Sequence, residues 1–481
     1  MGFASRTAES KLALEAFRGA LGPAGVVAEA DQTAGYLRDW GGDYRGYALC
    51  VLRPASVAEV QSVVQLCRAH RLAIIPQGGN TGLVNGGFSN DDRGSVIVSL
   101  ARLNRIRRLD AHDFTLEADA GCILQTLKDT AEDAGCLFPL ALGAQGSCQI
   151  GGNAATNAGG INVLRYGMAR DLILGLEVVL SDGEVWNGIT GLRKDNRGYD
   201  LKQLFIGAEG TLGIITGVEV KLFPKPNRSE VAYLGCTSFE NAMALMAMAR
   251  AVCSDLVTGF EVIGHECLAL ARVADPNIIF PVAETIPVHV VLECASSDAI
   301  DLRAMIEALI GAAIEKGLVA DAVLAESIAQ ARAFWAVREG LVEGQGKSGF
   351  HVRTDLSVRL HKVPMLIANA RAFVATHHPG WLGQAYGHAG DGNIHFNVMP
   401  PAGMAEADAR AEGGRILAGL YDIVAALDGS LSAEHGIGRS RRDVLWPALS
   451  PVHRRMLKAV KSAFDPDNIL NPGCLIPEGA A

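Results

Sequence analysis

Pro76-Gln77-Gly78-Gly79-Asn80-Thr81-Gly82 is the stretch of sequence that decides the fold. It follows Leu72-Ala73-Ile74-Ile75, a short apolar run that is typical of a buried β-strand. A strand that runs into three glycines within five residues exposes backbone N–H groups that no side chain shields. Such a group of donors suits a phosphate, although a plain tight turn is the commoner use of this pattern.

A second glycine-rich loop favours the ligand-binding interpretation. It runs from Gly143 to Gly160 and contains six glycines in eighteen residues. We expect the two loops to hold the two ends of one extended ligand. A third group, Gly207, Gly210 and Gly213, is spaced GxxGxxG and not GxGxxG, so the sequence does not support a Rossmann dinucleotide site.

The residues before the first loop predict a β-α-β unit. Ser56 stands three residues before Glu59, the spacing of a capping box at the start of a helix. Strands are predicted on either side of this helix, over 48–52 and 72–75. Further along, the pattern predicts strands over 96–100 and 114–118 and a helix over 122–134. The inward face of the first helix consists of Val57, Val60, Val63, Val64 and Cys67.

Length and charge limit the classes of function. The 481 residues are too many for one hydrophobic core, so we expect two or three domains. A formal net charge of −9, with Lys and Arg scattered among acids, argues against nucleic acid or an anionic membrane as the main partner. We therefore expect a small ligand.

The cysteines and the apolar runs indicate the compartment. The ten cysteines include no CxxC pair, so neither a zinc knuckle nor a redox dithiol is indicated. We expect buried, reduced thiols, which fit a cytosolic protein. No apolar run approaches the roughly 18 residues that span a bilayer, so contact with a membrane is expected only through a partner. The N-terminal residues predict a helix that buries Leu12, Leu14, Phe17 and Leu21.

The sequence pattern changes after Pro224-Lys225-Pro226, which marks a domain boundary. Beyond it, helical patterns at 241–252 and 300–316 alternate with strand patterns such as 288–292. This alternation predicts an α+β second domain, with a sheet backed by helices. From about residue 420, predicted helices at 423–427 and 451–464 form a short closing segment.

Five motifs are specific in combination and in this order: PQGGNTGL (76–83), GSCQIGGNAATNAGG (146–160), RKDNRGYDLKQLFIGAEGTLGIIT (193–216), GHAGDGNIHFNV (387–398) and SAEHGIG (432–438). Together they resemble the FAD-dependent D-2-hydroxy-acid dehydrogenases of the vanillyl-alcohol-oxidase superfamily, and among these the D-2-hydroxyglutarate dehydrogenases most closely. The similarity covers roughly residues 46–477.

The resemblance implies an α+β fold. It consists of a vanillyl-alcohol-oxidase-type FAD-binding domain of two α+β subdomains, an α+β substrate (cap) domain and a short helical C-terminal segment. We expect an N-terminal helical lead-in at 1–45 and the FAD-binding domain at 46–226. The substrate domain is expected at 227–420, and the segment that closes the active site at 421–481.

The resemblance also implies FAD as the cofactor, with the region of Glu209 near its adenine and ribose end. In some relatives a histidine of the first glycine loop bonds covalently to the flavin. Here that region offers Asn80, so we expect non-covalent FAD. The implied contacts are Pro76, Gly78, Gly79, Asn80, Thr81, Gly82, Pro139, Gly143, Ser147, Gly151, Gly152, Asn157, Gly159, Gly160, Glu209, Gly210, Ile214, Ile215 and Asn471.

His388 and His395, followed far downstream by Glu434 and His435, are the best metal candidates. Two imidazoles and one carboxylate leave coordination positions open, as a catalytic zinc site requires. On spacing alone, a structural role is the commoner one for such a histidine pair. The resemblance implies that His388, His395 and Glu434 bind Zn²⁺, with Mn²⁺ and Fe²⁺ as alternatives, and that His435 is the base beside them.

The resemblance implies oxidation of a D-2-hydroxy acid to the 2-oxo acid, with the hydride passing to flavin N5. Arg338 matches an arginine-bearing helix of the family and is the candidate for binding the C1 carboxylate. Tyr386 and Asn397 are further substrate candidates. The alternative for Arg338 is a surface ion pair with Glu339 or Glu343.

The chain departs from the D-2-hydroxyglutarate dehydrogenases at two positions. Val342 stands in place of a threonine, and Arg353 stands in place of a lysine. Arg353 can still bind a distal carboxylate, but arginine and lysine do not place charge identically. We therefore expect D-2-hydroxyglutarate as the leading substrate, D-malate as an alternative, and D-lactate or glycolate as alternatives within the family.

The electron acceptor is expected to be an electron-transfer flavoprotein or a quinone, because the sequence contains no nicotinamide fingerprint. A homodimer is compatible with the sequence. A zinc hydrolase that uses His388, His395 and Glu434 is the alternative from another class, but it leaves both glycine loops without a purpose. A flavin-binding protein without turnover is disfavoured because this ligand set and His435 are complete. Arg439, Arg441 and Arg442 predict a solvated helix face.

Overall fold

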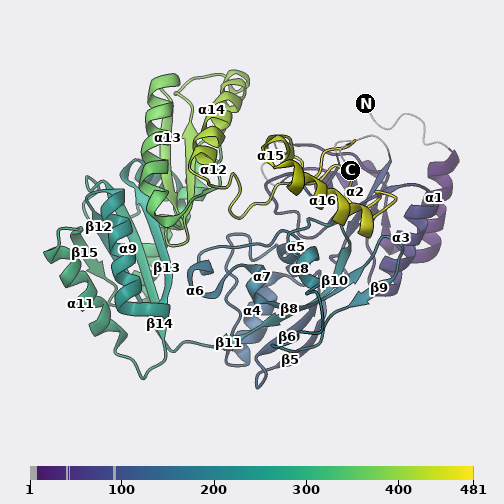
Figure 1. The fold of residues 1–481 in the computed structure, drawn as a ribbon, viewed down its shortest axis with the longest axis horizontal. Helices are drawn as coiled ribbons and strands as arrows, with labels where there is room; N and C mark the ends of the chain where they lie inside the picture. Colours follow the sequence, from purple (N-terminus) through teal and green to yellow (C-terminus); the bar gives the residue numbers. More distant parts are fainter. Residues whose placement is uncertain (1–7, 40–41, 43, 90–93, 480–481) are drawn as a thin grey trace. The chain divides into compact units, whose positions relative to one another are not determined.

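The computed structural model describes residues 8–39, 42, 44–89 and 94–479, so the expected lead-in and C-terminal segment are described except for 1–7, 40, 41, 43, 480 and 481. The described chain forms two compact units. The first consists of the residues up to 159, of 168–225 and of the residues from 434 onward. The second consists of 160–167 and 226–433 (Figure 1).

The smaller sheet of the first unit contains the strand that leads into the first glycine loop. Its strand order is β1-β2-β4-β3, and both β2 and β3 run parallel to β4. Helix α3 connects β2 to β3, which confirms the predicted β-α-β unit. The elements are β1 (Val26–Val27), β2 (Val51–Leu52), α3 (Val57–Ala69), β3 (Ala73–Gln77) and β4 (Ser95–Ser99).

The predicted cap at the start of α3 is present. The Ser56 hydroxyl oxygen accepts a hydrogen bond from the backbone N–H of Glu59 at 3.2 Å. The Glu59 carboxylate in turn accepts from the backbone N–H of Ala55 at 2.7 Å. These bonds satisfy donors that the first helical turn leaves unpaired. The buried face of the helix consists of Val60, Val63, Val64 and Cys67.

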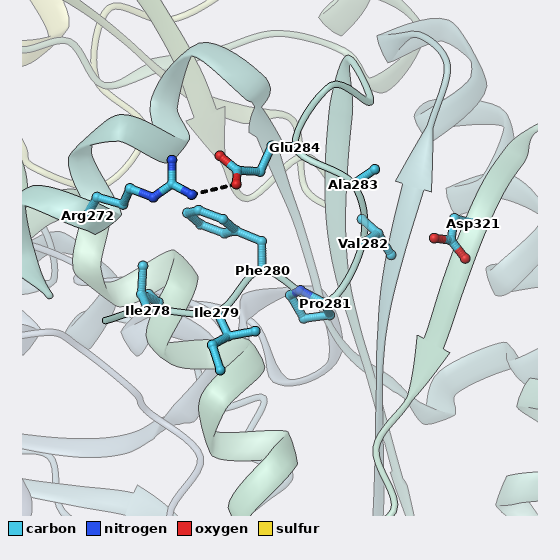
Figure 2. Close-up of a pocket in the computed structure, with 9 residues that line it drawn as sticks. All are labelled: Arg272, Ile278, Ile279, Phe280, Pro281, Val282, Ala283, Glu284 and Asp321. Carbon is cyan, nitrogen blue, oxygen red and sulfur yellow. Dashed lines mark hydrogen bonds and ion pairs between the residues drawn. The ribbon is translucent and has the colours of Figure 1, made fainter. Parts of the chain in front are cut away.

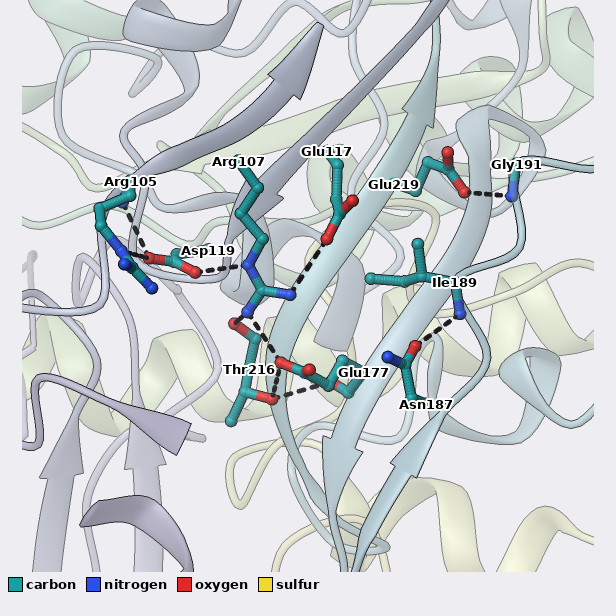
Figure 3. A network of polar contacts seen from close by, with 10 residues as sticks. All are labelled: Arg105, Arg107, Glu117, Asp119, Glu177, Asn187, Ile189, Gly191, Thr216 and Glu219. Atoms are coloured by element: carbon teal, nitrogen blue, oxygen red, sulfur yellow. Dashed lines mark hydrogen bonds and ion pairs between the residues drawn. The ribbon is translucent and has the colours of Figure 1, made fainter. Parts of the chain in front are cut away.

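The larger sheet of the first unit is antiparallel, with the strand order β5-β6-β10-β8-β9. Arg107 crosses this sheet from β5, donating to Asp119 at 2.6 Å, to Glu177 at 2.7 Å and to Glu117 at 3.2 Å (Figure 3). Burial alone would lower the pKa of Arg107, but its bonds to Glu177 and Asp119 more than offset this and raise it. The strands are β5 (Ile106–Asp110), β6 (Thr115–Asp119), β8 (Ile173–Val179), β9 (Val185–Asn187) and β10 (Ile214–Lys221).

The C-terminal tail joins the first unit beside β3. The backbone N–H of Ile74 donates to the carbonyl of Ile469 at 2.7 Å, and the N–H of Asn471 donates to the carbonyl of Ile74 at 2.8 Å. The remaining elements of this unit are α1 (Ala8–Leu21), α2 (Ala30–Thr33), α4 (Leu124–Asp133), β7 (Cys136–Leu137), α5 (Ile150–Ala155), α7 (Ala169–Leu172), α8 (Lys202–Phe205), β11 (Phe223–Pro224), α15 (Arg442–Ala448) and α16 (Pro451–Phe464).

The second unit is built on a seven-stranded antiparallel sheet with the order β15-β12-β14-β13-β17-β18-β16. Its strands are β12 (Arg228–Cys236), β13 (Val257–Gly264), β14 (Val288–Ser296), β15 (Val319–Leu324), β16 (Leu356–Ser357), β17 (Leu382–Gly387) and β18 (Asn393–Met399). Its helices are α6 (Val163–Tyr166), α9 (Phe239–Cys253), α10 (Leu268–Ala274), α11 (Leu302–Glu315), α12 (Ile328–Lys347), α13 (Val363–His377) and α14 (Glu406–Ala426).

Helices cover both faces of this sheet. Ala232 and Leu234 of β12 pack into a core with α9, α11, α13 and α14, whereas Val231 and Tyr233 pack into a second core with α10 and α12. The alternation follows from the two-residue period of a strand. It confirms the predicted α+β architecture with a sheet backed by helices.

Three local expectations are corrected. Leu12 is 58% exposed, because it lies about 140° around α1 from the buried Phe17, and Ala13 takes its place in the core. The expected strand 48–52 is regular only as β2 (Val51–Leu52). The expected short helix at 423–427 is the end of α14, which continues through position 420.

The glycines of α14 explain why the sequence predicts a shorter helix than the one observed. Glycine lowers the helix propensity of the sequence, but at these positions the absence of a side chain lets aromatic rings pack against the helix backbone. A Cβ atom at Gly419 would lie 2.1 Å from the Phe373 ring, and one at Gly413 would lie 3.0 Å from the Phe350 ring.

The expectations for the cysteines and for membrane spans are met. All ten cysteines are buried free thiols. Among the described helices, each is too short or too polar to cross a bilayer.

Candidate active site

The two glycine loops of the first unit touch through their backbones. A Cβ atom at Gly79 would lie 2.1 Å from the carbonyl oxygen of Ser147, far inside contact distance. A Cβ atom at Gly78 would lie 3.6 Å from the Cα atom of Gly152. Glycine is therefore required at position 79, and the two loops predicted to share a ligand lie side by side.

These loops have open space beside several glycines and contain buried acceptor atoms that lack hydrogen-bond partners. Within the described chain, a Cβ atom at Gly82, Gly143 or Gly152 would have no atom within 4 Å, and the same holds at Gly146. Two buried side-chain oxygens, of Gln149 and Asn153, lack a hydrogen-bond partner among the described residues. An unpaired buried acceptor costs about 1–3 kcal/mol, so a ligand with O–H or N–H donors would be stabilised here. FAD carries both kinds of donor besides its phosphates, and these residues fit it.

Two asparagines in these loops have backbone φ angles in the left-handed region, and each makes a hydrogen bond that fixes its loop. Asn80 has φ 54° and donates to the carbonyl of Arg38 at 2.8 Å. Asn157 has φ 49°, and its side-chain oxygen accepts from the N–H of Arg170 at 2.9 Å. Of the other predicted contacts, Pro139, Gly151 and Gly159 are buried, Thr81 is half-buried and Ser147 is exposed, while Gly160 belongs to the second unit.

Glu209 is bonded to the chain itself. Its buried carboxylate accepts from the N–H groups of Ile437 at 2.8 Å and Gly438 at 2.9 Å, and from the Cys474 thiol at 3.3 Å. Burial raises the pKa of Glu209, while these bonds oppose the rise. Glu209 therefore anchors the loop that follows His435.

The neighbours of Glu209 complete this anchor. Asn471 donates to the carbonyls of Glu209 at 2.7 Å and Gly86 at 3.0 Å. A Cβ atom at Gly210 would lie 3.0 Å from the Pro76 ring, so this turn rests on the end of β3. The predicted contacts Ile214 and Ile215 are buried at the start of β10.

The arginine cluster corrects a prediction, because it does not form a solvated helix face. Arg439 donates to the Asn471 side-chain oxygen at 2.7 Å, and Arg441 is only 8% exposed. Arg442 donates to the carbonyl of Gly473. Arg439 and Arg442 tie the tail to the 436–442 segment, and Arg441 donates to the carbonyl of Gly436, which local pattern could not reveal.

His435 is half-buried in the first unit, with its Nδ1 atom 3.4 Å from the Arg441 guanidinium. The guanidinium can only donate, so Nδ1 is the acceptor of this contact. The contact fixes the direction of the imidazole ring.

His388 and His395 are brought together in the second unit. Their ring centroids lie 5.6 Å apart at 79°, and one ring nitrogen of each lies within 4.8 Å of the other. Nδ1 of His388 lies 2.5 Å from the Glu261 carboxylate, and Nδ1 of His395 lies 3.3 Å from the carbonyl of Thr354. Both partners are acceptors, so each Nδ1 donates the hydrogen of its bond, and Nε2 is the atom of each ring that would face a cation. This pair fits a divalent cation such as Zn²⁺.

Asp355 fixes the chain immediately before Glu434. The backbone N–H of Ala433 donates to the Asp355 carbonyl and side-chain oxygens, each at 3.1 Å. Ser357 forms a β-bridge with Ser430. Glu434 follows Ala433 by one peptide bond and is the first residue of the returning segment of the first unit.

Arg338 lies in α12 and is only 6% exposed. Its Nε atom donates to Glu261 at 2.7 Å, and its guanidinium lies 4.8 Å from the centre of the Tyr386 ring. The alternative surface pairing is not the one observed, since Glu343 pairs with Lys347. Arg338 is thus a buried cation held in one orientation.

Tyr386 and Asn397 belong to one buried polar network. The Tyr386 hydroxyl donates to Gln345 at 2.8 Å, and Asn397 donates to the same oxygen at 3.0 Å. The side-chain oxygen of Asn397 accepts from the N–H of Thr354 at 2.9 Å. Burial raises the pKa of Tyr386 to about 12, so the phenol stays protonated.

Arg353 is half-buried, and its neighbours in the sequence, Val352 and Thr354, are buried. Its Nε atom donates to Nε2 of His351 at 3.1 Å. Val352 forms a β-bridge with Val398, which anchors this segment to β18. The guanidinium is therefore positioned by its neighbours in the second unit.

Two acidic residues of this site were missed from the sequence. Burial raises the pKa of Glu261, but the charges of and bonds from His388 and Arg338 more than reverse this and lower it to about 2. Burial raises the pKa of Asp391 to about 6. The signal for Glu261 was a single charge inside the otherwise uncharged run Val257–Gly264.

A surface hollow of the second unit lies apart from the predicted residues. It lies between α10 and the 278–284 segment, and Arg272 and Glu284 are ion-paired on its wall (Figure 2). The Arg272 guanidinium also lies 5.0 Å from the centre of the Phe280 ring. None of the predicted site residues lines it.

Two family models match the chain: a FAD binding domain over residues 48–188 and the C-terminal domain of FAD linked oxidases over 225–475. The D-2-hydroxyglutarate dehydrogenase, mitochondrial, of Bos taurus is 39% identical over 95% of this chain and 82% of its own. The D-2-hydroxyglutarate dehydrogenase of Xanthomonas citri pv. viticola is 37% identical over 92% of each chain.

Solved structures support the fold. The substrate-bound crystal structure of p-cresol methylhydroxylase is similar with a TM-score of 0.79, covering 100% of this chain and 99% of that one. An alkyldihydroxyacetonephosphate synthase is similar with a TM-score of 0.73, covering 97% of this chain and 85% of that one. Both are 17% identical in sequence, so they inform the fold alone.

Proposed function

Since the chain belongs to the FAD-linked oxidase family and is an FAD-dependent D-2-hydroxy-acid dehydrogenase, we propose that it oxidises D-2-hydroxyglutarate to 2-oxoglutarate with the help of a divalent cation. One observation carries the proposal. In the second unit, a pair of imidazoles whose Nδ1 atoms face acceptors stands beside a buried arginine. This is the pairing that a 2-hydroxy acid needs, because it presents a hydroxyl to a cation and a carboxylate to a guanidinium.

The cation would be held by His388, His395 and Glu434, and the FAD by the two glycine loops. Zn²⁺ suits two nitrogens and one carboxylate oxygen, and Mn²⁺ and Fe²⁺ are the alternatives. When bound, such a cation supplies Lewis acidity that lowers the pKa of a coordinated hydroxyl group. FAD supplies the acceptor for two electrons and a hydride.

The chain's own residues bind the substrate and move its proton. Arg338 binds the C1 carboxylate, since its guanidinium is buried and fixed in direction by Glu261. Arg353 binds the distal carboxylate. His435 accepts the hydroxyl proton, because a neutral imidazole near pH 7 is a suitable base and His435 directly follows the proposed cation ligand Glu434.

The substrate and the acceptor are proposed on separate grounds. D-2-hydroxyglutarate leads because relatives of that name cover nearly the whole chain, and D-malate, D-lactate and glycolate are the competing substrates. Val342, where the family resemblance implies a threonine, is 50% exposed. The electrons would pass to a flavoprotein or a quinone.

Anaerobic stopped-flow mixing of the flavoprotein with single hydroxy acids tests this proposal. We expect D-2-hydroxyglutarate to bleach the flavin fastest among D-2-hydroxyglutarate, D-malate, D-lactate and glycolate. L-2-hydroxyglutarate should leave the flavin oxidised, and preincubation with a chelator should slow the D enantiomer. Flavin that stays oxidised with every acid would refute the dehydrogenase, and full activity after proven metal removal would refute the cation.

The substrate's length is tested by Arg353→Ala in the same assay. The variant should lose reduction by D-2-hydroxyglutarate by about 10- to 100-fold, the size of a lost charged hydrogen bond, and should keep most of its reduction by D-lactate. Arg338→Ala is the matched control, because it should weaken both acids alike. Equal losses in Arg353→Ala would show that Arg353 does not reach the far carboxylate.

A further inference from the structure

We propose that Glu261 is a positioning residue that couples metal binding by His388 to substrate binding by Arg338. The inference rests on the proposed roles of those two side chains. It concerns a strand residue that touches neither the substrate nor the metal.

The register of the sheet places Glu261 where it can do this. Strand β13 pairs with β17 through Val262 and Gly387, so the next positions along the antiparallel ladder are Glu261 and His388. Arg338 reaches the same carboxylate from α12, which packs against this face of the sheet. Three elements therefore meet at one side chain.

The carboxylate divides its two oxygens between the two partners. Oε1 lies 2.5 Å from Nδ1 of His388, and Oε2 lies 2.7 Å from Nε of Arg338. The side chains are 1%, 9% and 7% exposed for Glu261, His388 and Arg338, so water cannot replace either bond. One rigid group thus sets the direction of an imidazole and of a guanidinium at once.

Each bond has a chemical consequence. The bond to His388 keeps the proton on Nδ1, presents Nε2 to a cation and makes that nitrogen a stronger ligand. The bond to Arg338 holds Nε and so sets the direction of the two terminal nitrogens, the parallel donors that suit a carboxylate. A displaced Glu261 would disturb both functions together.

The protein contains a matched control. Glu293, on the adjacent strand β14, is half-buried and also binds α12, accepting from Trp335 Nε1 at 2.9 Å. Trp335 lies one helical turn before Arg338. The bonds of Glu293 go to Trp335 and Thr258. The two carboxylates share the sheet and the helix that they bind, and they differ in which groups they orient.

The experiment compares Glu261→Gln with Glu293→Gln in the full-length flavoprotein. Zn²⁺ affinity is measured by chelator competition and metal analysis without substrate, and kcat and KM are measured for D-2-hydroxyglutarate and D-lactate. Glu261→Gln should weaken Zn²⁺ binding by about 10- to 100-fold and raise KM for both acids by a similar factor. Glu293→Gln should leave Zn²⁺ affinity and both KM values near those of the wild type, with FAD content unchanged in both variants.

A double variant covers the case in which Glu261→Gln folds poorly. Glu261→Leu with Arg338→Met replaces the ion pair by apolar side chains, a change that buried pairs often tolerate. It should fold and still bind Zn²⁺ weakly, whereas Arg338→Met alone, which keeps Glu261 on His388, should bind Zn²⁺ normally.

Native Zn²⁺ affinity in both Glu261 variants would overturn the inference, and so would a loss that Glu293→Gln shares. A change in metal affinity without a change in KM would overturn the coupling. These outcomes are distinct from a failure of the proposed function, which would show in the wild type as flavin that no D-2-hydroxy acid reduces.

Discussion

At the scale of single residues, buried polar groups in the second unit differ in whether they have partners. Glu261 has two, and its charge is stabilised. His289 is fully buried on β14, and its ring nitrogens lie near the backbones of Glu284 and Ile286 but, within the described chain, have no partner at hydrogen-bond geometry. A buried group with partners, such as Glu261, orients side chains of the proposed site. A buried group without them, such as His289, makes the free energy of unfolding depend on pH.

His289 should make the unfolding free energy fall on acidification. Burial lowers the pKa of His289, so the folded state prefers the neutral ring while the unfolded state titrates near its ordinary value of about 6.5. The stability is full above that value and is lost as the pH falls toward the lower folded pKa, by up to about 1.4 kcal/mol per pH unit. Urea unfolding at pH 7.5, 6 and 5 should show a shallower decline for His289→Leu than for the wild type. If the unfolding free energies of the variant and the wild type fall equally with pH, His289 is not the cause of the decline.

His435→Ala tests the proposed base. The variant should reduce its flavin about 100- to 10,000-fold more slowly, as expected for the loss of a general base, because no group then accepts the hydroxyl proton. FAD content, measured by absorbance after denaturation, should match the wild type. Reduction at the native rate would exclude His435 as the base.

At the scale of elements, the antiparallel sheet of the first unit depends on a charge network as well as on apolar packing. Arg107→Met should reduce the unfolding free energy by about 3–5 kcal/mol, because it removes the cation of Glu177 and leaves the buried Asp119 with only the exposed Arg105. Arg105→Met is the control. It removes another partner of Asp119, but that side chain is 75% exposed, so the cost should stay below about 1 kcal/mol. Equal losses of unfolding free energy in the two variants, measured by chemical denaturation, would show that Arg107 is not the main cation of this network.

We expect the contact between the two glycine loops to set FAD affinity. Gly79→Ala should weaken FAD binding by at least about tenfold, because the new methyl group would overlap the Ser147 carbonyl and push the loops apart. Gly19→Ala, in α1 of the same unit, should retain FAD, since a Cβ atom there would meet no described atom within 4 Å and Gly19 is not a predicted FAD contact. Titration of flavin-free protein followed by fluorescence measures both. A Gly79→Ala protein that binds FAD normally would show that the loops need not touch.

At the scale of the whole molecule, two units with separate cores serve different parts of one proposed reaction. The glycine loops belong to the first unit, whereas the imidazole pair and both substrate arginines belong to the second. The segment from Glu434 onward returns to the first unit directly after the contacts of Asp355 with Ala433. The reaction needs both units, but their stabilities can be measured separately.

FAD should stabilise the first unit more than the second. At a concentration 100 times its Kd, FAD adds about 2.7 kcal/mol to whatever it binds, so calorimetry of flavin-free protein should show one transition rising more than the other. FMN, which lacks the adenylate half, should produce a smaller shift. Equal shifts of both transitions with FAD would mean that the cofactor's contacts are not concentrated in the first unit.

The sequence by itself determined the local structure and the candidate residues. The cap at Ser56 and the strands around the first glycine loop follow from spacing within short windows, whereas the metal role of His388 and His395 is implied by the family resemblance of their motif. Tertiary structure alone decided which distant groups support them. Glu261 meets His388 across 127 positions of sequence, and Glu209 meets Gly438 across 229. Periodicity and capping act between near neighbours, whereas strand register and burial bring remote side chains together, and no short stretch of sequence encodes that meeting.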